Sequence, residues 1–185
     1  MFGMNEDKGM NALELLKRDH DDVDEMFKHY EEIKESARKS EKDNLVARIC
    51  DALTVHASIE ETIFYPEARR ALSEKGKDLL DEAAVEHQTL KDIIARLEAA
   101  PTDDPLYDAG VKVLSEYVKH HVQEEETELF PKVRSSGMDL QAVGKRLAAR
   151  KEQLMQPGSG PAQASANGGR RSSSKDSIAS TPKRR

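Results

Sequence analysis

The chain has 185 residues, a net charge of −6 at pH 7, 35% charged residues and a single cysteine, Cys50. This length suits one domain with a hydrophobic core and is short for two. No apolar run approaches the roughly 20 residues that cross a bilayer, and the first residues lack the basic and apolar regions of a secretory signal. One cysteine forms neither an intrachain disulfide nor a cysteine-based zinc cluster. We therefore expect a cytoplasmic protein without a membrane segment.

Four segments show the spacing of amphipathic helices. In each, apolar residues recur every three or four positions, which places them on one helix face and predicts a stripe directed at a shared core. No segment alternates apolar and polar residues as a half-buried strand does. In chain order the stripes are Leu13, Leu16, His20, Val23, Phe27 and Tyr30; Leu45, Ile49, Leu53, His56, Glu60 and Ile63; Leu80, Ala83, His87, Leu90, Ile94 and Leu97; and Leu106, Gly110, Leu114, Tyr117, His121 and Glu125.

Helix-breaking residues lie between the stripes. A polar stretch at 36–43 separates the first two helices, and Gly76 follows the second. Residues 101–105 separate the third helix from the fourth, with Asp103 and Asp104 available as N-caps. These connections are short, so consecutive helices should run antiparallel to each other.

The fourth helix is expected to end at 135–137, Ser-Ser-Gly, before a shorter fifth helix at about 139–154. The predicted fold is therefore all-α, an up-down-up-down four-helix bundle with a short C-terminal helix. We assign 1–10 to an N-terminal extension, 11–155 to the bundle and 156–185 to a disordered basic tail.

The predicted tail differs from the rest of the chain in charge and composition. Residues 156–185 contain six Lys or Arg and one Asp, a net of +5, which leaves −11 for residues 1–155. The tail is rich in Gly, Ser, Pro and Ala, so it buries too little apolar surface to offset its ordering entropy. Its basic end could contact nucleic acid or another acidic partner. The lack of interleaved aromatic residues favours a solvated tail instead.

The second and fourth stripes carry the same motif. HASIEETIFYPEAR, starting at His56, aligns without gaps to HVQEEETELFPKVR, starting at His121. The first and third stripes match around His20 and His87, which lie 36 and 34 residues before those histidines. The chain therefore reads as two similar helical hairpins related by an approximate twofold axis.

Each hairpin offers one histidine from its first helix and a His-x3-Glu pair from its second. Positions i and i+4 share a helix face, so the imidazole and the carboxylate can bind the same ion. Six such ligands suit two first-row metal ions, with one or both carboxylates bridging them. Imidazole with carboxylate favours iron, zinc, copper or nickel over calcium or magnesium. The predicted metal ligands are His20, His56, Glu60, His87, His121 and Glu125.

Each ligand also has a plainer interpretation, because a single histidine on an apolar stripe is commonly a hydrogen-bonded core residue. A metal-free bundle would then have to bury six polar side chains, each costly unless paired. Glu61 and Glu126 also repeat, but five residues rotate them by about 140° from the histidine. We assign them to the surface or to the support of the ligands, and Glu126 remains an alternative ligand to Glu125.

Several further residues lie outside the repeated ligand pattern. His120 is one step off its stripe and is expected at the surface or beside a ligand, and His29 lies outside the pattern. Pro66 and Pro131 are expected to kink or end the helices just after the metal layer. Cys50 is expected to be a packing residue.

The segments HASIEETIFYP and HHVQEEETELFP, with those around His20 and His87, resemble the hemerythrin-like family, also called the HHE cation-binding domain. The resemblance covers about residues 11–154. It implies a four-helix bundle with a centre of two non-haem irons, bridged by oxygen or a carboxylate, that binds oxygen or a related small ligand. The six predicted ligands match the metal positions of this family.

One departure from the family pattern changes the expected chemistry. By resemblance, oxygen-carrying members have a second histidine one turn from the third-helix ligand, whereas Ala83 and Lys91 stand four before and four after His87. One iron should therefore have a position for water or an exchangeable ligand. This favours peroxide chemistry, nitric oxide binding or iron and oxygen sensing over oxygen carriage.

Catalase-like disproportionation of H2O2 would make the protein an enzyme, whereas sensing of O2 or NO would involve no turnover. The alternative is a metal-dependent regulatory or interaction module that uses the bundle and the basic tail.

Overall fold

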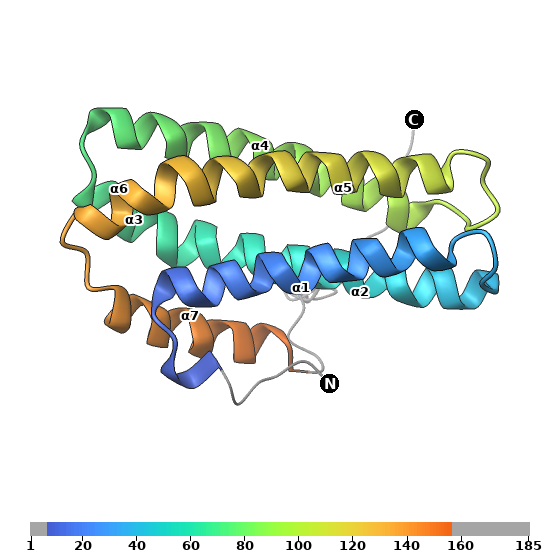
Figure 1. The fold of residues 1–185 in the computed structure, drawn as a ribbon, viewed down its shortest axis with the longest axis horizontal. Helices are drawn as coiled ribbons and strands as arrows, with labels where there is room; N and C mark the ends of the chain where they lie inside the picture. The colour runs from blue at the N-terminus through green and yellow to red at the C-terminus, as the bar shows by residue number, and fades with distance from the viewer. Residues whose placement is uncertain (1–6, 157–185) are drawn as a thin grey trace, which may run out of the picture.

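The computed structural model describes residues 7–156, which form four long antiparallel helical segments with a shorter helix against one side (Figure 1). In chain order the elements are the 3-10 turn η1 (Asp7–Gly9), α1 (Ala12–Ile33), α2 (Lys39–Ile59), the π-helical turn η2 (Glu60–Phe64), α3 (Tyr65–Ala71), α4 (Glu74–Ala99), α5 (Tyr107–Glu124), the π-helical turn η3 (Glu125–Leu129), α6 (Phe130–Ser135) and α7 (Leu140–Leu154). No strand occurs within this range, so the all-α prediction is confirmed. The predicted tail beyond Gln156 and residues 1–6 of the extension lie outside the described residues.

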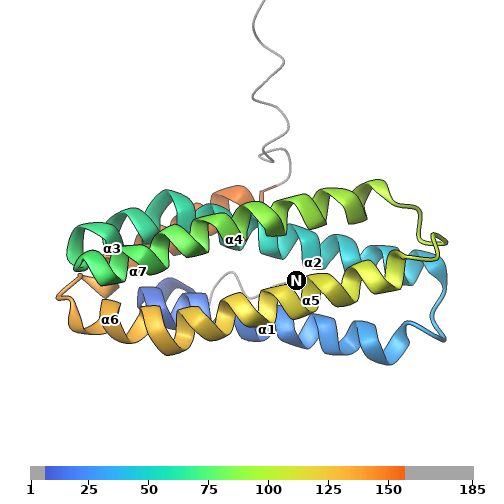
Figure 2. The same ribbon diagram turned by 90° about the horizontal axis from the view of Figure 1, so that it is seen from above.

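The four-helix path runs up, down, up and down as predicted. Figure 2 shows the α1–α2 and α4–α5 connections at one end of the bundle and the α3–α4 and α6–α7 connections at the other. The α4–α5 hairpin lies over the α1–α2 hairpin, and α7 packs against the other side of α1 and α2 (Figure 1). None of the helices within 7–156 has the length and apolar character needed to cross a membrane.

Helix ends follow local capping chemistry, with two differences from the predicted boundaries. Gly76 lies in the first turn of α4 rather than closing the second helix. Neither predicted aspartate caps α5, whose N-cap is Leu106. The Asp104 carboxylate instead accepts a hydrogen bond from the Leu106 backbone N–H at 2.7 Å, one residue before the helix begins. At the start of α1, Asn11 forms a reciprocal capping box with Glu14.

The predicted stripes are buried along most of their length. The exceptions fall on the second and fourth stripes. In the fourth, Leu106 is 73% exposed, and Gly110 and Tyr117 are half-buried, because the face of α5 that points to the core is shifted by one position. The buried residues of that face are Tyr107, Val111, Leu114, Val118 and His121. Ile63 is also only half-buried, and Phe64 takes its inward place.

The π-helical turns explain that shift in the second stripe. Pro66 and Pro131 have no backbone N–H and crowd the carbonyl four residues earlier. The chain widens just before each proline, and the N–H of Tyr65 bonds to the Glu60 carbonyl five residues back, as Phe130 does to Glu125. Both prolines then lie in the first turn of α3 and α6, so the helices continue past the expected breaks. Each π-helical turn begins at a predicted ligand glutamate.

Two apolar clusters fill the bundle. One lies toward the α1–α2 and α4–α5 connections and includes Phe27, Tyr30 and Leu114. The other lies toward the opposite end and includes Leu16, Phe64 and, from α7, Leu147. Cys50 is buried in the first cluster, in the packing position predicted for it.

Candidate metal centre

The structure brings all six predicted ligand residues together inside the bundle. Every one is buried, from Glu60 at 0% exposure to His56 at 7%. Each of the four bundle helices supplies one histidine, and the two π-helical turns supply the glutamates. Within 7–156, the ligand atoms of His20, His56, Glu60 and Glu125 lie within 4.8 Å of one another, as do those of Glu60, His87 and His121.

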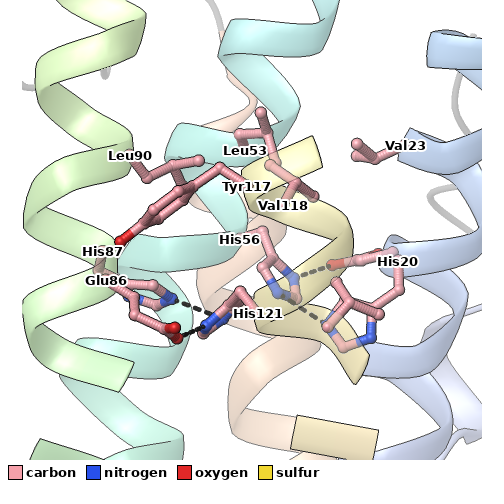
Figure 3. Close-up of a pocket in the computed structure, with 12 residues that line it drawn as sticks. His20, Val23, Leu53, His56, Glu86, His87, Leu90, Tyr117, Val118 and His121 are labelled. Carbon is pink, nitrogen blue, oxygen red and sulfur yellow. Dashed lines mark hydrogen bonds and ion pairs between the residues drawn. The ribbon is translucent and has the colours of Figure 1, made fainter. Parts of the chain in front are cut away.

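The histidines meet as two pairs (Figure 3). The Nε2 atoms of His20 and His56 are 3.1 Å apart, and those of His87 and His121 are also 3.1 Å apart. Glu60 joins the pairs, because its Oε2 lies 3.1 Å from His56 Nε2 and 3.4 Å from His87 Nε2. Across the centre, Glu125 Oε2 lies 3.4 Å from His20 Nε2 and 3.7 Å from His121 Nε2. Each carboxylate therefore reaches one histidine of each pair.

A carboxylate holds the outer nitrogen of every histidine. Glu126 lies 2.9 Å from His20 Nδ1, and Glu61 lies 3.0 Å from His87 Nδ1. Glu61 and Glu126 therefore each contact one of the clustered histidines from outside the cluster. Glu125, not Glu126, lies within the cluster.

The other two supporting carboxylates directly precede a ligand histidine in the sequence. Asp19 lies 3.5 Å from His56 Nδ1, and Glu86 lies 2.7 Å from His121 Nδ1. The sequence pattern assigns no role to either residue. Each acts on the neighbouring helix, a contact that spacing within one helix does not reveal.

This arrangement leaves the centre in need of a cation. An Nδ1–H that donates to a carboxylate puts the imidazole lone pair on Nε2. Two lone pairs then face each other across 3.1 Å in each pair, and a proton or a metal ion between them relieves the repulsion. In addition, Glu60 Oε1 and Glu125 Oε2 are buried without a hydrogen-bond partner among the described residues. Buried polar atoms without partners are costly, so the donor set fits a bound metal.

The electrostatics of the centre favour positive charge on the imidazoles. Burial alone would lower the pKa of His56, but the attraction and hydrogen bonding of Glu60 and Asp19 raise it well above its ordinary value. Burial likewise opposes the charged form of His20, and the adjacent carboxylates of Glu125 and Glu126 raise its pKa. Burial would raise the pKa of Glu60, yet His56 and His87 hold that pKa well below its ordinary value. The site therefore stabilises the charged form of Glu60 and the positively charged form of the histidines that face it.

Tyr65 is a site residue that the sequence reasoning missed. Its buried hydroxyl donates a 2.8 Å hydrogen bond to Glu125 Oε1 and lies 3.3 Å from His87 Nε2. Burial, reinforced by Glu125 and Glu60, raises the pKa of this phenol well above its ordinary value. Tyr65 belongs to the repeated motif, but a π-helical turn directs its side chain inward. A helix pattern with a period of 3.6 residues does not predict such a turn.

A small cavity of about 20 Å³ adjoins both histidine pairs. Figure 3 shows His20 and His56 on one side of it and His87 and His121 on the other. Its remaining lining is mostly apolar and includes Val23, Leu53, Leu90, Val118 and Val122. The two histidines outside the pattern lie at the surface, with His29 at 56% and His120 at 60% side-chain exposure.

An antiparallel helical bundle with buried histidine and glutamate clusters at its centre is the architecture of a helical metal-binding protein. Residues 11–133 match the family described as the hemerythrin HHE cation binding domain. The chain belongs to this family, as its repeated motif indicated.

A solved structure and one curated relative agree with this assignment, and a second curated relative has a different name. A crystal structure of a hemerythrin HHE cation binding domain-containing protein from Mycobacterium kansasii has a TM-score of 0.65 and 26% identity, covering 78% of this chain and 86% of that one. A Nostoc sp. (strain PCC 7120) protein named DNA nickase is 28% identical over 127 residues, 69% of this chain and 34% of its own length. An uncharacterized hemerythrin-like protein of Schizosaccharomyces pombe is 27% identical over 79 residues, 43% of this chain and 39% of its own. The chain therefore spans about a third to two fifths of the length of these curated relatives.

Proposed function

We propose that this chain is a non-haem di-iron protein that binds O2 or reacts with peroxide or nitric oxide at its buried centre. The observation that carries the proposal is the pair of facing imidazoles in each half, linked by two carboxylates with unpartnered buried oxygens. The proposed iron ligands are His20, His56, Glu60, His87, His121 and Glu125.

The donors divide unequally between the two metal positions. Both glutamates lie closer to the first histidine pair, at 3.1 Å from His56 and 3.4 Å from His20, than to the second pair, at 3.4 Å from His87 and 3.7 Å from His121. Glu125 accordingly falls outside the close group formed by Glu60, His87 and His121. A position with fewer protein donors leaves room for an exchangeable ligand. Two irons in this site would supply the electrons for reduction of O2 or of a peroxide. The small cavity beside both histidine pairs suits such a ligand in size.

The chain's own residues would control access and protons. The apolar lining of Val23, Leu53, Leu90 and Val118 limits water at the centre. Tyr65 keeps its proton, because its pKa is raised, and its hydroxyl lies within 3.5 Å of Glu60 and Glu125. It can therefore hold a proton beside the position with fewer donors. Carboxylates on the Nδ1 atoms fix the ring orientations and increase the basicity of the histidines.

Oxygen release tests the peroxide branch of this proposal. The protein is loaded anaerobically with Fe2+, mixed with H2O2 and followed with an oxygen electrode, with the His56→Ala variant as the control. We expect one O2 for every two H2O2 consumed by the wild type and none above background from the variant. Sensing would instead give a spectral change with O2 or NO and no turnover. A di-iron protein inert to all three ligands would contradict the proposal.

A second candidate is a metal-dependent interaction module, and the charge separation favours it. Residues 156–185 carry +5 against −11 for the remainder, and the Nostoc relative is named a DNA nickase. The tail would then contact an acidic partner such as DNA. Removing residues 157–185 should abolish a DNA mobility shift and leave the iron spectrum unchanged. A full-length chain that shifts no DNA at low salt would contradict DNA as that partner.

A further inference from the structure

A second group of side chains that could hold a metal ion lies between α4 and α5 at the edge of the buried centre, with one buried, one half-buried and one exposed member. It consists of Glu86, His120 and Glu124. His120 Nε2 lies 3.4 Å from Glu124 Oε1 and 3.8 Å from Glu86 Oε1. We propose that this group binds a first-row divalent cation at the surface and passes it to the buried centre, an inference that rests on the proposed di-iron function.

The geometry suits a transient cation site. His120 and Glu124 are four residues apart on α5, so they share one helix face, and Glu86 approaches them from α4. Donors about 2.0–2.2 Å from one metal lie roughly 3–3.5 Å from each other, close to the observed separations. Imidazole with two carboxylates matches the donor preference of Fe2+, Zn2+, Co2+ and Mn2+. The side chain of His120 is 60% exposed, so an ion reaches it directly from solvent.

Glu86 connects the surface group to the centre. Its Oε1 faces His120, while its Oε2 accepts the 2.7 Å hydrogen bond from His121 Nδ1 (Figure 3). A cavity of about 10 Å³ lies alongside and is lined by Glu82, Glu86, Glu124, His121 and Glu125. Glu125 is the residue whose buried Oε2 has no hydrogen-bond partner. Glu125 thus lines this cavity and also lies 3.4 Å from His20 in the centre, so its carboxylate would be the next ligand for an incoming cation.

Charge separates this position from the other supporting carboxylates. Lys17 lies 3.1 Å from Glu126 and Lys91 lies 2.6 Å from Glu61. Glu86 has no lysine or arginine within ion-pair distance in the described part of the chain and faces His120 instead. A carboxylate without a fixed cation retains its negative charge for an arriving metal.

The matching position in the other hairpin has no such donors. The motif alignment pairs His120 with Val55 and Glu124 with Ile59. Asp19, the counterpart of Glu86, lies 2.5 Å from Lys151 of α7, which covers this side. The apolar residues offer a cation no ligand there, and the positive charge of the lysine would repel it. The proposed route therefore opens only on the α4–α5 side.

Metal uptake by the full-length apoprotein tests the route without measuring activity. Co2+ is mixed rapidly with the wild type, with H120A/E124Q and with the control H29A/E116Q. The control removes another exposed histidine and an exposed glutamate of α5. The initial rate comes from the growth of the Co2+ absorption, and the end-point from elemental analysis after desalting. The same proteins, with Zn2+ at the centre, are then titrated with Mn2+ and free Mn2+ is read by electron paramagnetic resonance.

We expect H120A/E124Q to reach the same Co2+ end-point as wild type about tenfold more slowly, because it lacks the charged donors that collect the ion. We also expect it to lose one Mn2+ equivalent that wild type and control bind. Equal rates and equal Mn2+ binding would overturn the surface site, as would a lowered Co2+ end-point, which would make these residues part of the centre. A wild type that takes up no Co2+ would instead contradict the proposed function, while the Mn2+ titration would still test the surface group.

Discussion

The two hairpins hold equivalent pairs of histidines in unequal surroundings. His20 and His56 in the α1–α2 hairpin approach each other as closely as His87 and His121 in the α4–α5 hairpin, at 3.1 Å between Nε2 atoms. Yet α7 packs over the first hairpin, while the second presents Glu86 beside half-buried Glu124 and exposed His120. The two halves of the repeat therefore share the same histidine and glutamate positions but differ in the residues that surround them. Two metals in such a site would differ in access and in ligand count.

The aromatic neighbours sharpen this difference. Phe130 stacks on His20, with ring centroids 6.0 Å apart and planes 13° apart. Its counterpart Tyr65 lies 5.4 Å from the His87 ring and adds a hydroxyl that bonds to Glu125. The α4–α5 side is thus the more polar half of the centre.

The largest expected effect comes from removing one ligand in each half. We expect His56→Ala and His121→Ala each to lose at least one metal equivalent and about 3–4 kcal/mol of holoprotein stability, since bound metal stabilises only the folded state. Elemental analysis and thermal unfolding check both, with exposed His29→Ala as the control. Unchanged iron content in both variants would contradict the ligand assignment.

The next effect tests the docking of α7 on the first half. A Cβ on Gly144 would lie 2.5 Å from the Met10 carbonyl oxygen and 2.8 Å from the Ala12 nitrogen, both backbone atoms that cannot rotate away. We expect Gly144→Ala to cost about 2–3 kcal/mol in urea unfolding. Gly9→Ala is the control, since a Cβ there meets nothing within 4 Å. Equal stability of the two variants would show that α7 is not packed as described.

Lysine replacements compare the halves directly. The Lys151 side chain is 15% exposed and pairs with Asp19 and Asp7, whereas Lys91 is 42% exposed and pairs with Glu61. We expect Lys151→Met to cost about 2 kcal/mol, because it leaves buried Asp19 uncompensated, and Lys91→Met less than about 1 kcal/mol. Chemical unfolding of both apoproteins measures the difference. A larger loss in the Lys91 variant would reverse the comparison.

The last comparison concerns the hydroxyl of Tyr65. Tyr65→Phe removes the donor to Glu125 and should cost about 1 kcal/mol, comparable to Tyr30→Phe, which removes a 2.5 Å hydrogen bond to Asp108 outside the centre. Only Tyr65→Phe should shift the absorption of Co2+ bound in the protein. Identical spectra for the two variants would remove Tyr65 from the site.

The helical bundle and the convergence of the six histidine and glutamate side chains could be predicted from the sequence, because both follow helix periodicity. His-x3-Glu puts two donors on one face within a single helix, as at His56 and Glu60, and the repeat supplied the second copy. The support of each histidine could not be predicted in this way, because Asp19 and Glu86 act across helices. The inward turn of Tyr65 depends on a π-helical turn, which shifts the register by one residue at the metal layer. The packing of α7 on one hairpin depends on tertiary contacts alone.

The central claim, a two-metal centre in this bundle, is tested most directly by metal content. Protein purified from iron-supplemented cells is analysed for its elements, and the absorption spectrum of the same sample is recorded. We expect two irons per chain, with near-ultraviolet bands of a bridged pair. Protein without metal, or with zinc that iron cannot replace, would contradict the account.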